Sequence, residues 1–277
     1  KLDEIRALCH GATVLRSGRV TGTCDPRQES SGSLARMMIG GDLPHPQHRE
    51  SRVHGDGVLV VDHLSLAADD PFGTALHDIH LTVRAGEIVG IAGVSGNGQR
   101  ELLAALSGER RVAPAGAIVI EGVPAGRLDA AQRRELGLGF VPEERLGRGA
   151  VPEMSLAENA LLTAHGAGLA LRGVRQITRL SSSPHQSSRM PSSAAGGPQA
   201  VARSLSGGNL QKFIVGREIR LAPKVLIAAQ PTWGVDVGAA AQVRQALIDL
   251  AGAGVAVLVV SEELDELFEI CDRLAVI

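Results

Sequence analysis

The chain has 277 residues, of which 44% are hydrophobic, so one large domain or two small ones can bury an apolar core. Lysine and arginine number 28 against 30 aspartates and glutamates, and the formal charge of −2 gives no general attraction to nucleic acid or anionic lipid. Three cysteines without paired or metal-like spacing are typical of a reducing compartment. The apolar run at residues 255–260 has the length of a buried strand, far below the ~18 residues of a membrane span.

The first residues of the chain repeat its last ones. Residues 1–14 align with residues 263–276 at an offset of 262 residues, with Leu2 on Leu264, and the alignment places Cys9 on Cys271. An offset of one domain length indicates a duplicated protein. Residues 1–41, opening on an amphipathic helix, are therefore interpreted as the C-terminal remnant of a first domain, and the chain as cut from a longer protein. A chance alignment over so short a window is the alternative.

The segment after this remnant predicts a linker. Residues 13–20 predict a strand and tight turn, and residues 34–39 a helix. Residues 42–57 contain Pro44, Pro46 and three histidines but few apolar residues, which indicates an interdomain linker. A metal site on these histidines would lack a carboxylate or cysteine framework, so a solvated linker is favoured.

Residues 58–277 predict a second domain of α/β class. The alternating segments 58–61 and 76–83 indicate an antiparallel β-subdomain, and residues 87–92 a buried strand. Further strands are expected at 117–120, 225–227 and 255–260, and helices at 99–106 and 128–136. Residues 172–198 are rich in serine and lack hydrophobic periodicity, which indicates a divergent loop or a shifted reading frame.

A glycine loop follows the strand at residues 87–92 and opens a helix, which is the context of a phosphate-binding P-loop. Its residues are Gly93, Val94, Ser95, Gly96, Asn97, Gly98, Gln99 and Arg100. The glycines allow an anion nest of backbone amides. The pattern asks for Lys and then Ser or Thr at the last two positions, so both the phosphate-binding cation and the Mg²⁺-binding hydroxyl are missing. A dinucleotide site with Glu121 on the ribose is the rival, but Glu101 replaces its third glycine.

A second glycine loop precedes a helix-forming, amphipathic run. Its residues are Leu205, Ser206, Gly207, Gly208 and Asn209. Such a junction points backbone amides and a hydroxyl at an anion, although an ordinary Ser N-cap with a flexible Gly pair is the plain alternative. The loop resembles the signature loop of ABC-type ATPases, which closes over the γ-phosphate of ATP held by a facing domain.

Further positions resemble the same family, but most lack the side chain that the family uses. Ala229 stands where the Mg²⁺-ordering Asp is expected, and Gln230 where the water-polarising Glu is expected. Glu262 takes the place of the switch histidine, and Glu143 that of the glutamine loop. Asp236 matches the loop that links the two sites across the dimer. The order and spacing of these motifs over residues 93–262 make the resemblance specific.

The chain is thus similar to the second ATPase domain of a tandem ABC importer subunit. The resemblance implies a P-loop NTPase fold with a mixed β-sheet core, an antiparallel β-subdomain and a helical subdomain, disrupted here by residues 172–198. In that family each ATP lies between one domain's P-loop and the other's signature loop. The losses then imply one impaired site at residues 93–100 and one competent site to which this chain lends its signature loop. ATP is the implied cofactor, with Mg²⁺ at the site completed by the missing first domain, and no metal site is expected on this chain.

The motifs resemble subunits of ribose, galactose and nucleoside importers, and the loss of both acids at Ala229 and Gln230 is closer to the nucleoside branch. The implied partners are transmembrane permease subunits, a periplasmic or lipoprotein substrate receptor, and an ABC ATPase domain in the same or a second subunit, with no nucleic acid. The implied location is peripheral, on the cytoplasmic face of the cell membrane. Residues 143–160 are expected to meet the permease, with Ser155 beginning a helix there.

Two alternatives remain open. A soluble tandem ABC ATPase acting on ribosomes or nucleic acid should have a long basic or helical interdomain arm, which residues 42–57 do not provide. A non-functional gene fragment would account for the serine-rich interruption and the ragged ends. Purified alone, the fragment is expected to lack ATPase activity.

Overall fold

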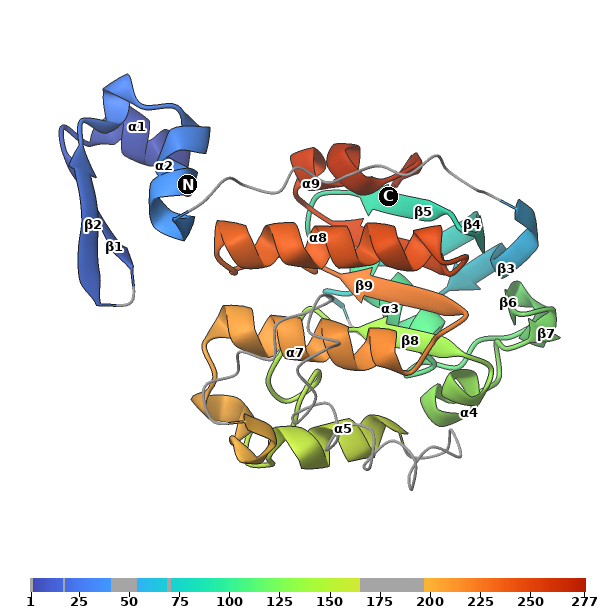
Figure 1. Cartoon of the computed structure of the whole chain (residues 1–277). Helices are drawn as coiled ribbons and strands as arrows, with labels where there is room; N and C mark the ends of the chain where they lie inside the picture. Colours follow the sequence, from blue (N-terminus) through green and yellow to red (C-terminus); the bar gives the residue numbers. More distant parts are fainter. Residues whose placement is uncertain (1, 17, 41–53, 69–70, 165–196) are drawn as a thin grey trace.

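The computed structural model describes residues 2–16, 18–40, 54–68, 71–164 and 197–277 (Figure 1). The N-terminal part contains α1 (Leu2–Leu8), a hairpin of β1 (Ala12–Arg16) and β2 (Arg19–Cys24), and α2 (Ser31–Ile39). The hairpin confirms the strand and turn expected at residues 13–20. Helix α2 begins three residues before the expected start because Ser30 caps it, accepting a hydrogen bond from the Ser33 backbone N–H at 3.0 Å.

A five-stranded parallel sheet forms the centre of residues 54–277. Its order is β11 (Arg273–Val276), β5 (Ile88–Ala92), β10 (Ala256–Ser261), β9 (Val225–Ala229) and β8 (Leu138–Val141). Every residue of β5, β9 and β10 is buried, which explains their uninterrupted apolar sequences. The expected strands at residues 87–92, 225–227 and 255–260 are confirmed.

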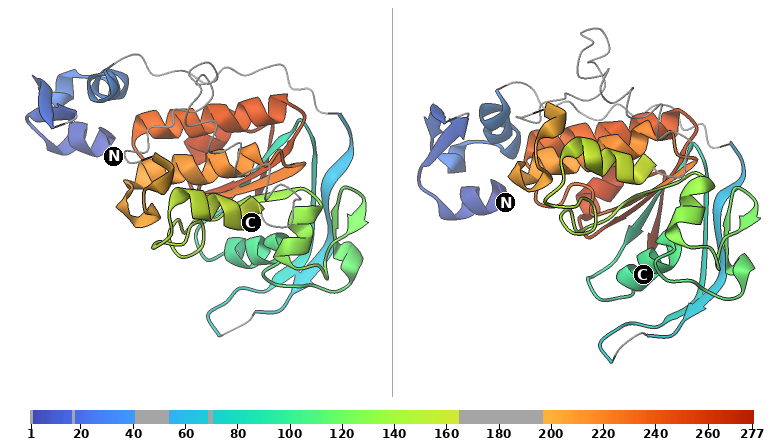
Figure 2. Two further views of the ribbon diagram at one scale, coloured as in Figure 1. Left: turned by 60° about the horizontal axis from the view of Figure 1, so that its bottom comes forward. Right: turned by 90° about the horizontal axis from the view of Figure 1, so that it is seen from below.

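Two apolar layers cover the two faces of this sheet. Helices α7 (Gly207–Arg220), α8 (Val237–Gly252) and α9 (Leu264–Ile270) pack on one face, against Leu226 and Val257. Helix α3 (Gln99–Ser107) packs on the other face, against Ile227 and Leu258. Consecutive side chains of a strand point to opposite faces of the sheet, so neighbouring residues such as Leu226 and Ile227 pack into different cores. Figure 2 shows α7 and α8, in orange and red-orange, on one side of the central strands and α3, in blue-green, on the other.

Those outer strands form an antiparallel sheet in the order β4 (Leu76–Ala85), β3 (His54–Leu66), β6 (Ile118–Ile120) and β7 (Val123–Pro124). This confirms the predicted antiparallel subdomain. Strand β3 starts at His54, within the predicted linker 42–57, because its first residues continue the ladder: His54 pairs with Ala85, and Gly57 with Arg84. The rest of that linker, residues 42–53, lies outside the described residues.

Shorter elements connect the sheets. They are α4 (Ala130–Glu135), α5 (Leu156–Ala164) and the 3₁₀ turns η1 (Pro26–Gln28), η2 (Ala115–Ala117), η3 (Gly197–Gln199) and η4 (Ala202–Ser204). Ser155 and Glu158 form reciprocal hydrogen bonds at the start of α5, as in a capping box, so the helix expected there is confirmed. The serine-rich segment 172–198 lies outside the described residues, apart from its last two. In the described part of the chain, no helix is both long and apolar enough to cross a membrane.

Candidate nucleotide site

The parallel sheet gathers the predicted site residues at one edge. Ala92 pairs with Ser261 and Ala229 with Val260, while Val141 pairs with Ala228, so four parallel strands end at nearly the same level. The loops after the carboxyl ends of parallel strands form the usual ligand crevice of such sheets. The glycine loop, Gln230, Glu262 and the segment of Glu143 all follow these strand ends.

The glycine loop has the backbone that a phosphate cradle needs. Gly96 and Gly98 have φ angles of 93° and 110°, where a side chain would be strained. Gly98 precedes α3 without a side-chain cap, so the first amides of the helix face the loop. Thr74 fixes the loop by donating from Oγ1 to the Gly96 carbonyl at 2.7 Å. The side chain of Arg100 is exposed.

The side chain of Gln99 bridges this loop from within. Its Oε1 accepts a hydrogen bond from the Asn97 backbone N–H at 3.1 Å, and its Nε2 donates to the Val94 carbonyl at 3.0 Å. A neutral amide therefore uses an N–H group that an anion nest would offer to phosphate. The sequence indicates only that a lysine is missing, whereas the structure shows how its replacement engages the loop.

The other strand-end positions carry no intact metal ligand or base of the expected kind. Ala229 is 1% exposed at the end of β9 and offers no polar atom. Gln230 has a φ of 47°, and its Oε1 accepts from the Glu262 backbone N–H at 3.3 Å. Glu262 and Glu143 are exposed. The two positions where the family resemblance leads us to expect carboxylates are thus occupied by a methyl group and an amide.

The second glycine loop remains open at the N-terminus of α7. Ser206 is the N-cap and accepts from the Asn209 backbone N–H at 3.4 Å, so the plain capping role is present. Ser206 and Gly207 are exposed, with Leu205 partly buried beside them. Asp236 lies next to this loop, because a Cβ on Gly208 would be 3.2 Å from its Oδ2. Trp233, nearby in the chain, is 53% exposed and is not a core residue.

Arg145, which the sequence analysis missed, contacts the second glycine loop and the helix α7 that follows it. Its Nε donates to Gln211 Oε1 at 3.1 Å, and the buried Gln211 donates to the Pro231 carbonyl at 2.8 Å. The guanidinium lies against Gly207, where a Cβ would be 2.9 Å from Nη1, and burial lowers the pKa of Arg145. A basic residue two positions after Glu143 was the available signal. Arg145 places positive charge beside the N-terminus of α7, which favours an anion there.

Glu266 is a second residue that the sequence analysis missed. Its side chain is 2% exposed beneath the strand-end loops, and its Oε2 accepts from Ser261 Oγ at 2.9 Å. Burial raises the pKa of Glu266, which favours the neutral acid. Ser261 Oγ also lies 3.5 Å from Gln230 Oε1. Ser261 therefore connects the buried Glu266 to the residue that follows β9.

Comparison with known sequences gives the class of the protein. A sequence model described as ABC transporter matches residues 76–233, which is more than half of the chain. The chain therefore belongs to the ABC transporter ATP-binding family.

Its relatives in this family include import ATP-binding proteins. The chain is 38% identical over 276 residues to the guanosine import ATP-binding protein NupO of Bacillus subtilis, covering 98% of this chain and 53% of that protein. It is 37% identical over 300 residues to the glucose import ATP-binding protein TsgD13 of Haloferax volcanii, covering 100% and 50%. It is 34% identical over 287 residues to the ribose import ATP-binding protein RbsA of Halalkalibacterium halodurans, covering 100% and 54%. The chain thus spans about half the length of these relatives.

Solved structures agree on the fold. One described as the ATP-binding subunit of an ABC transporter matches with a TM-score of 0.63 and 22% identity, covering 79% of this chain and 85% of that chain. A nucleotide-free ATP-binding cassette matches with a TM-score of 0.62 and 18% identity, covering 80% and 87%. Sequence identities this low give no information about function, but the two structural matches confirm the predicted ABC-type α/β fold.

Proposed function

We propose that this chain is part of the ATP-binding subunit of an ABC importer for simple sugars or nucleosides. Relatives that match 98–100% of the chain at 34–38% identity are import ATP-binding proteins for glucose, guanosine and ribose. The importer would couple ATP binding and hydrolysis to transport from the cytoplasmic face of the membrane. Its permease and substrate receptor would hold the transported molecule, so the choice between sugar and nucleoside is made outside this chain.

The two glycine loops are proposed to have different roles because their states differ. The Gln99 amide bridges the glycine loop, Ala229 offers no ligand for Mg²⁺, and the neutral Gln230 amide cannot act as a base toward water, so the chain's own site is impaired. The loop at Ser206, Gly207 and Gly208 is exposed at the N-terminus of a long helix, beside Arg145. The proposed role of this loop is to close over the γ-phosphate of ATP carried, with Mg²⁺, by the P-loop of a facing domain.

Residues 1–41 are proposed to be the end of that facing domain. Helix α1 spans Leu2–Leu8 and helix α9 spans Leu264–Ile270, so both ends of the two helices differ by the offset of 262 residues found in the sequence. Strands β1 and β11 follow the two helices in the same order. The second domain is then proposed to begin at His54, with the linker shortened accordingly.

A surface for the permease is proposed around residues 143–160. A pocket of about 240 Å³ is lined by residues of β8, α4, α5, α7 and the loop before α5, among them Phe140, Val151, Leu162 and Arg217. Leu162 is 53% exposed on α5, and Val151 is 37% exposed before it. An apolar rim around a pocket suits an inserted segment of a partner protein.

The proposal is tested by nucleotide binding to the purified chain. Calorimetric titration with Mg-ATP is expected to give weak or no binding, and turnover is expected about 10²–10⁴-fold below that of an intact cassette. The double variant Gln99→Lys/Arg100→Thr should raise ATP affinity at least tenfold by restoring cation and hydroxyl, without restoring turnover, because Ala229 and Gln230 remain. Robust turnover by the unmodified chain would overturn the assignment of Gln99, Ala229 and Gln230.

The two alternatives predict different partners. An ATPase acting on ribosomes should sediment with ribosomes when ATP hydrolysis is blocked, whereas the import subunit should co-purify with permease subunits in detergent. A non-functional fragment should show neither association and should fail to unfold cooperatively. Ribosome association that depends on Ser206 would contradict the import proposal and favour the ATPase acting on ribosomes.

A further inference from the structure

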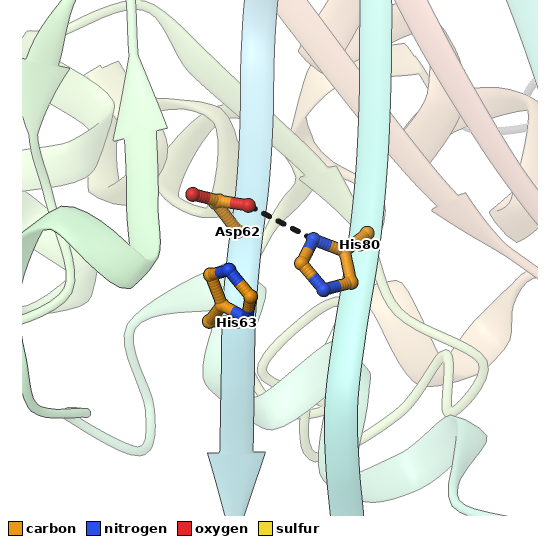
Figure 3. A group of neighbouring side chains, drawn as sticks. All are labelled: Asp62, His63 and His80. Atoms are coloured by element: carbon orange, nitrogen blue, oxygen red, sulfur yellow. Dashed lines mark hydrogen bonds and ion pairs between the residues drawn. The ribbon is translucent and has the colours of Figure 1, made fainter.

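Two neighbouring strands of the antiparallel sheet gather imidazole and carboxylate groups at one exposed spot. Figure 3 shows Asp62 and His63 on β3 beside His80 on β4. One ligand atom from each of these three residues lies within 4.8 Å of the other two. Asp62 Oδ1 is 2.9 Å from His80 Nδ1, and the two imidazole rings meet edge to face with centroids 4.3 Å apart. The three histidines weighed in the sequence analysis are not among them.

Two compensating β-bulges create this arrangement. Val61 pairs with Leu81 and Leu64 with Ile79, so Asp62 and His63 together oppose the single residue His80. The next pair, Leu66 with Leu76, places the extra residue on β4 instead, at His77 and Asp78. His63 and Asp78 have φ angles of 50° and 52°, in the left-handed region that non-glycine residues rarely adopt.

The bulges decide which way the side chains point. In a regular strand the consecutive residues Asp62 and His63 would face opposite sides of the sheet. The bulge at His63 instead brings both to the side of His80 (Figure 3). Asp78, carried by the second bulge, reaches the same rings: its Oδ1 is 2.6 Å from His63 Nδ1 and 3.2 Å from His80 Nε2. Strained backbone that converges polar side chains on one spot is typical of functional sites.

We propose that Asp62, His63 and His80 bind a divalent transition-metal ion of the zinc class. Two imidazoles and a carboxylate suit Zn²⁺, Co²⁺ or Ni²⁺, whereas Mg²⁺ prefers oxygen ligands alone. Two ligand atoms on a tetrahedral Zn²⁺ with bonds of about 2.0–2.1 Å are about 3.3 Å apart. The 2.9 Å between Asp62 Oδ1 and His80 Nδ1 needs to open by only a few tenths of an ångström, and the ion then takes the place of the proton between them.

Asp78 completes the proposal as a positioning residue. A carboxylate that accepts the N–H of a ligating histidine fixes the tautomer and orientation of the ring, and Asp78 already contacts His63 in this way. All four side chains are substantially exposed, from 47% for His80 to 73% for His63, so an ion reaches them from solvent and water can fill the remaining position. The bound ion would join β3 to β4.

The test uses the whole 277-residue chain with Zn²⁺ in calorimetry and Co²⁺ in visible absorption. The unmodified chain is expected to bind one ion at this site, with the d–d absorption of a low-symmetry Co²⁺ complex. His63→Gln and His80→Gln should each weaken binding at least tenfold, and Asp78→Asn about 10–100-fold, as removal of an orienting carboxylate does. All four residues are on the surface, and circular dichroism checks that each variant folds.

Two matched controls separate this site from other histidines. His77→Gln removes an exposed histidine on the same strand that does not belong to the cluster, and His45→Gln/His48→Gln removes two from the predicted linker. Both variants should bind as the unmodified chain does. Equal binding by His63→Gln, His80→Gln and the unmodified chain, or no ion bound at all, would overturn the proposal.

Discussion

Glu266 is a buried carboxylic acid whose ionisation opposes folding. Burial is the main cause that raises its folded-state pKa above the ordinary value of 4.5, against smaller opposing effects that include the charge of Arg244. A raised pKa contributes stability that is fully present below about pH 4.5 and is lost as the pH rises through the folded-state value. We therefore expect Glu266→Gln, which stays neutral, to flatten the fall in unfolding free energy over that range, measured by urea titration at several pH values.

Asp265→Asn is the matched control for this residue. Asp265 is the exposed neighbour on α9, so its replacement should leave the pH dependence of unfolding as it was. A Glu266→Gln variant with the same pH dependence as the unmodified chain would contradict a neutral acid at this position.

Single residues show where sequence analysis stops. The spacing of the motifs shows directly that Gln99, Ala229 and Gln230 stand where lysine, aspartate and glutamate are expected. The two hydrogen bonds of Gln99 inside the loop cannot, because they depend on rotamers and on the φ angles of Gly96 and Gly98. Arg145 and Glu266 were missed for a related reason, since no motif marks a residue whose role arises from packing between distant loops.

At the scale of elements, Arg133 connects α4 to the end of α3. Its side chain is fully buried and donates to the carbonyls of Ala105, Leu106, Gly126 and Leu128. The carbonyls of Ala105 and Leu106 lie in the last turn of α3, where the helix itself offers no backbone N–H to them. Arg133→Met would keep much of the apolar volume but remove the hydrogen bonds to the carbonyls of Ala105, Leu106 and Leu128, whereas the Gly126 carbonyl would keep its bond from the Val112 backbone N–H. We expect a loss of roughly 3 kcal/mol or more in unfolding free energy, measured in urea.

Arg111 supplies the comparison. It forms an exposed ion pair with Asp129 at 3.2 Å, and such pairs contribute at most about 1 kcal/mol, so Arg111→Met should change stability little. Equal effects of the two substitutions would show that the carbonyl contacts of Arg133 do not stabilise the fold.

Elements with strong periodicity could be predicted from the sequence, but their boundaries could not. The strands β5, β9 and β10 were expected because continuous apolar runs indicate strands buried on both faces. The start of β3 at His54 was missed because Gly55, Asp56 and Gly57 look like linker, although they lie along the edge strand β4. The bulges at His63 and Asp78 leave no signal in the sequence, since only the pairing register reveals them.

At the scale of the whole molecule, the proposed division of labour depends on an asymmetry between two loops. The parallel sheet holds the strand-end positions together, yet the glycine loop is bridged by Gln99 while the loop at Ser206 is open. In the proposed head-to-tail pair, the open loop serves ATP on the facing domain. The loop that Gln99 bridges then has a structural role and does not support turnover.

The most direct measurement compares Ser206→Arg with Gln99→Ala in the complete two-domain subunit, using steady-state ATP hydrolysis. Ser206→Arg should lower turnover by about 10²–10³-fold, because it blocks donors that stabilise the reacting phosphate. Gln99→Ala should leave turnover unchanged if, as proposed, the site it belongs to does not hydrolyse ATP. Full activity in Ser206→Arg, or loss of activity in Gln99→Ala, would contradict the proposed division of labour.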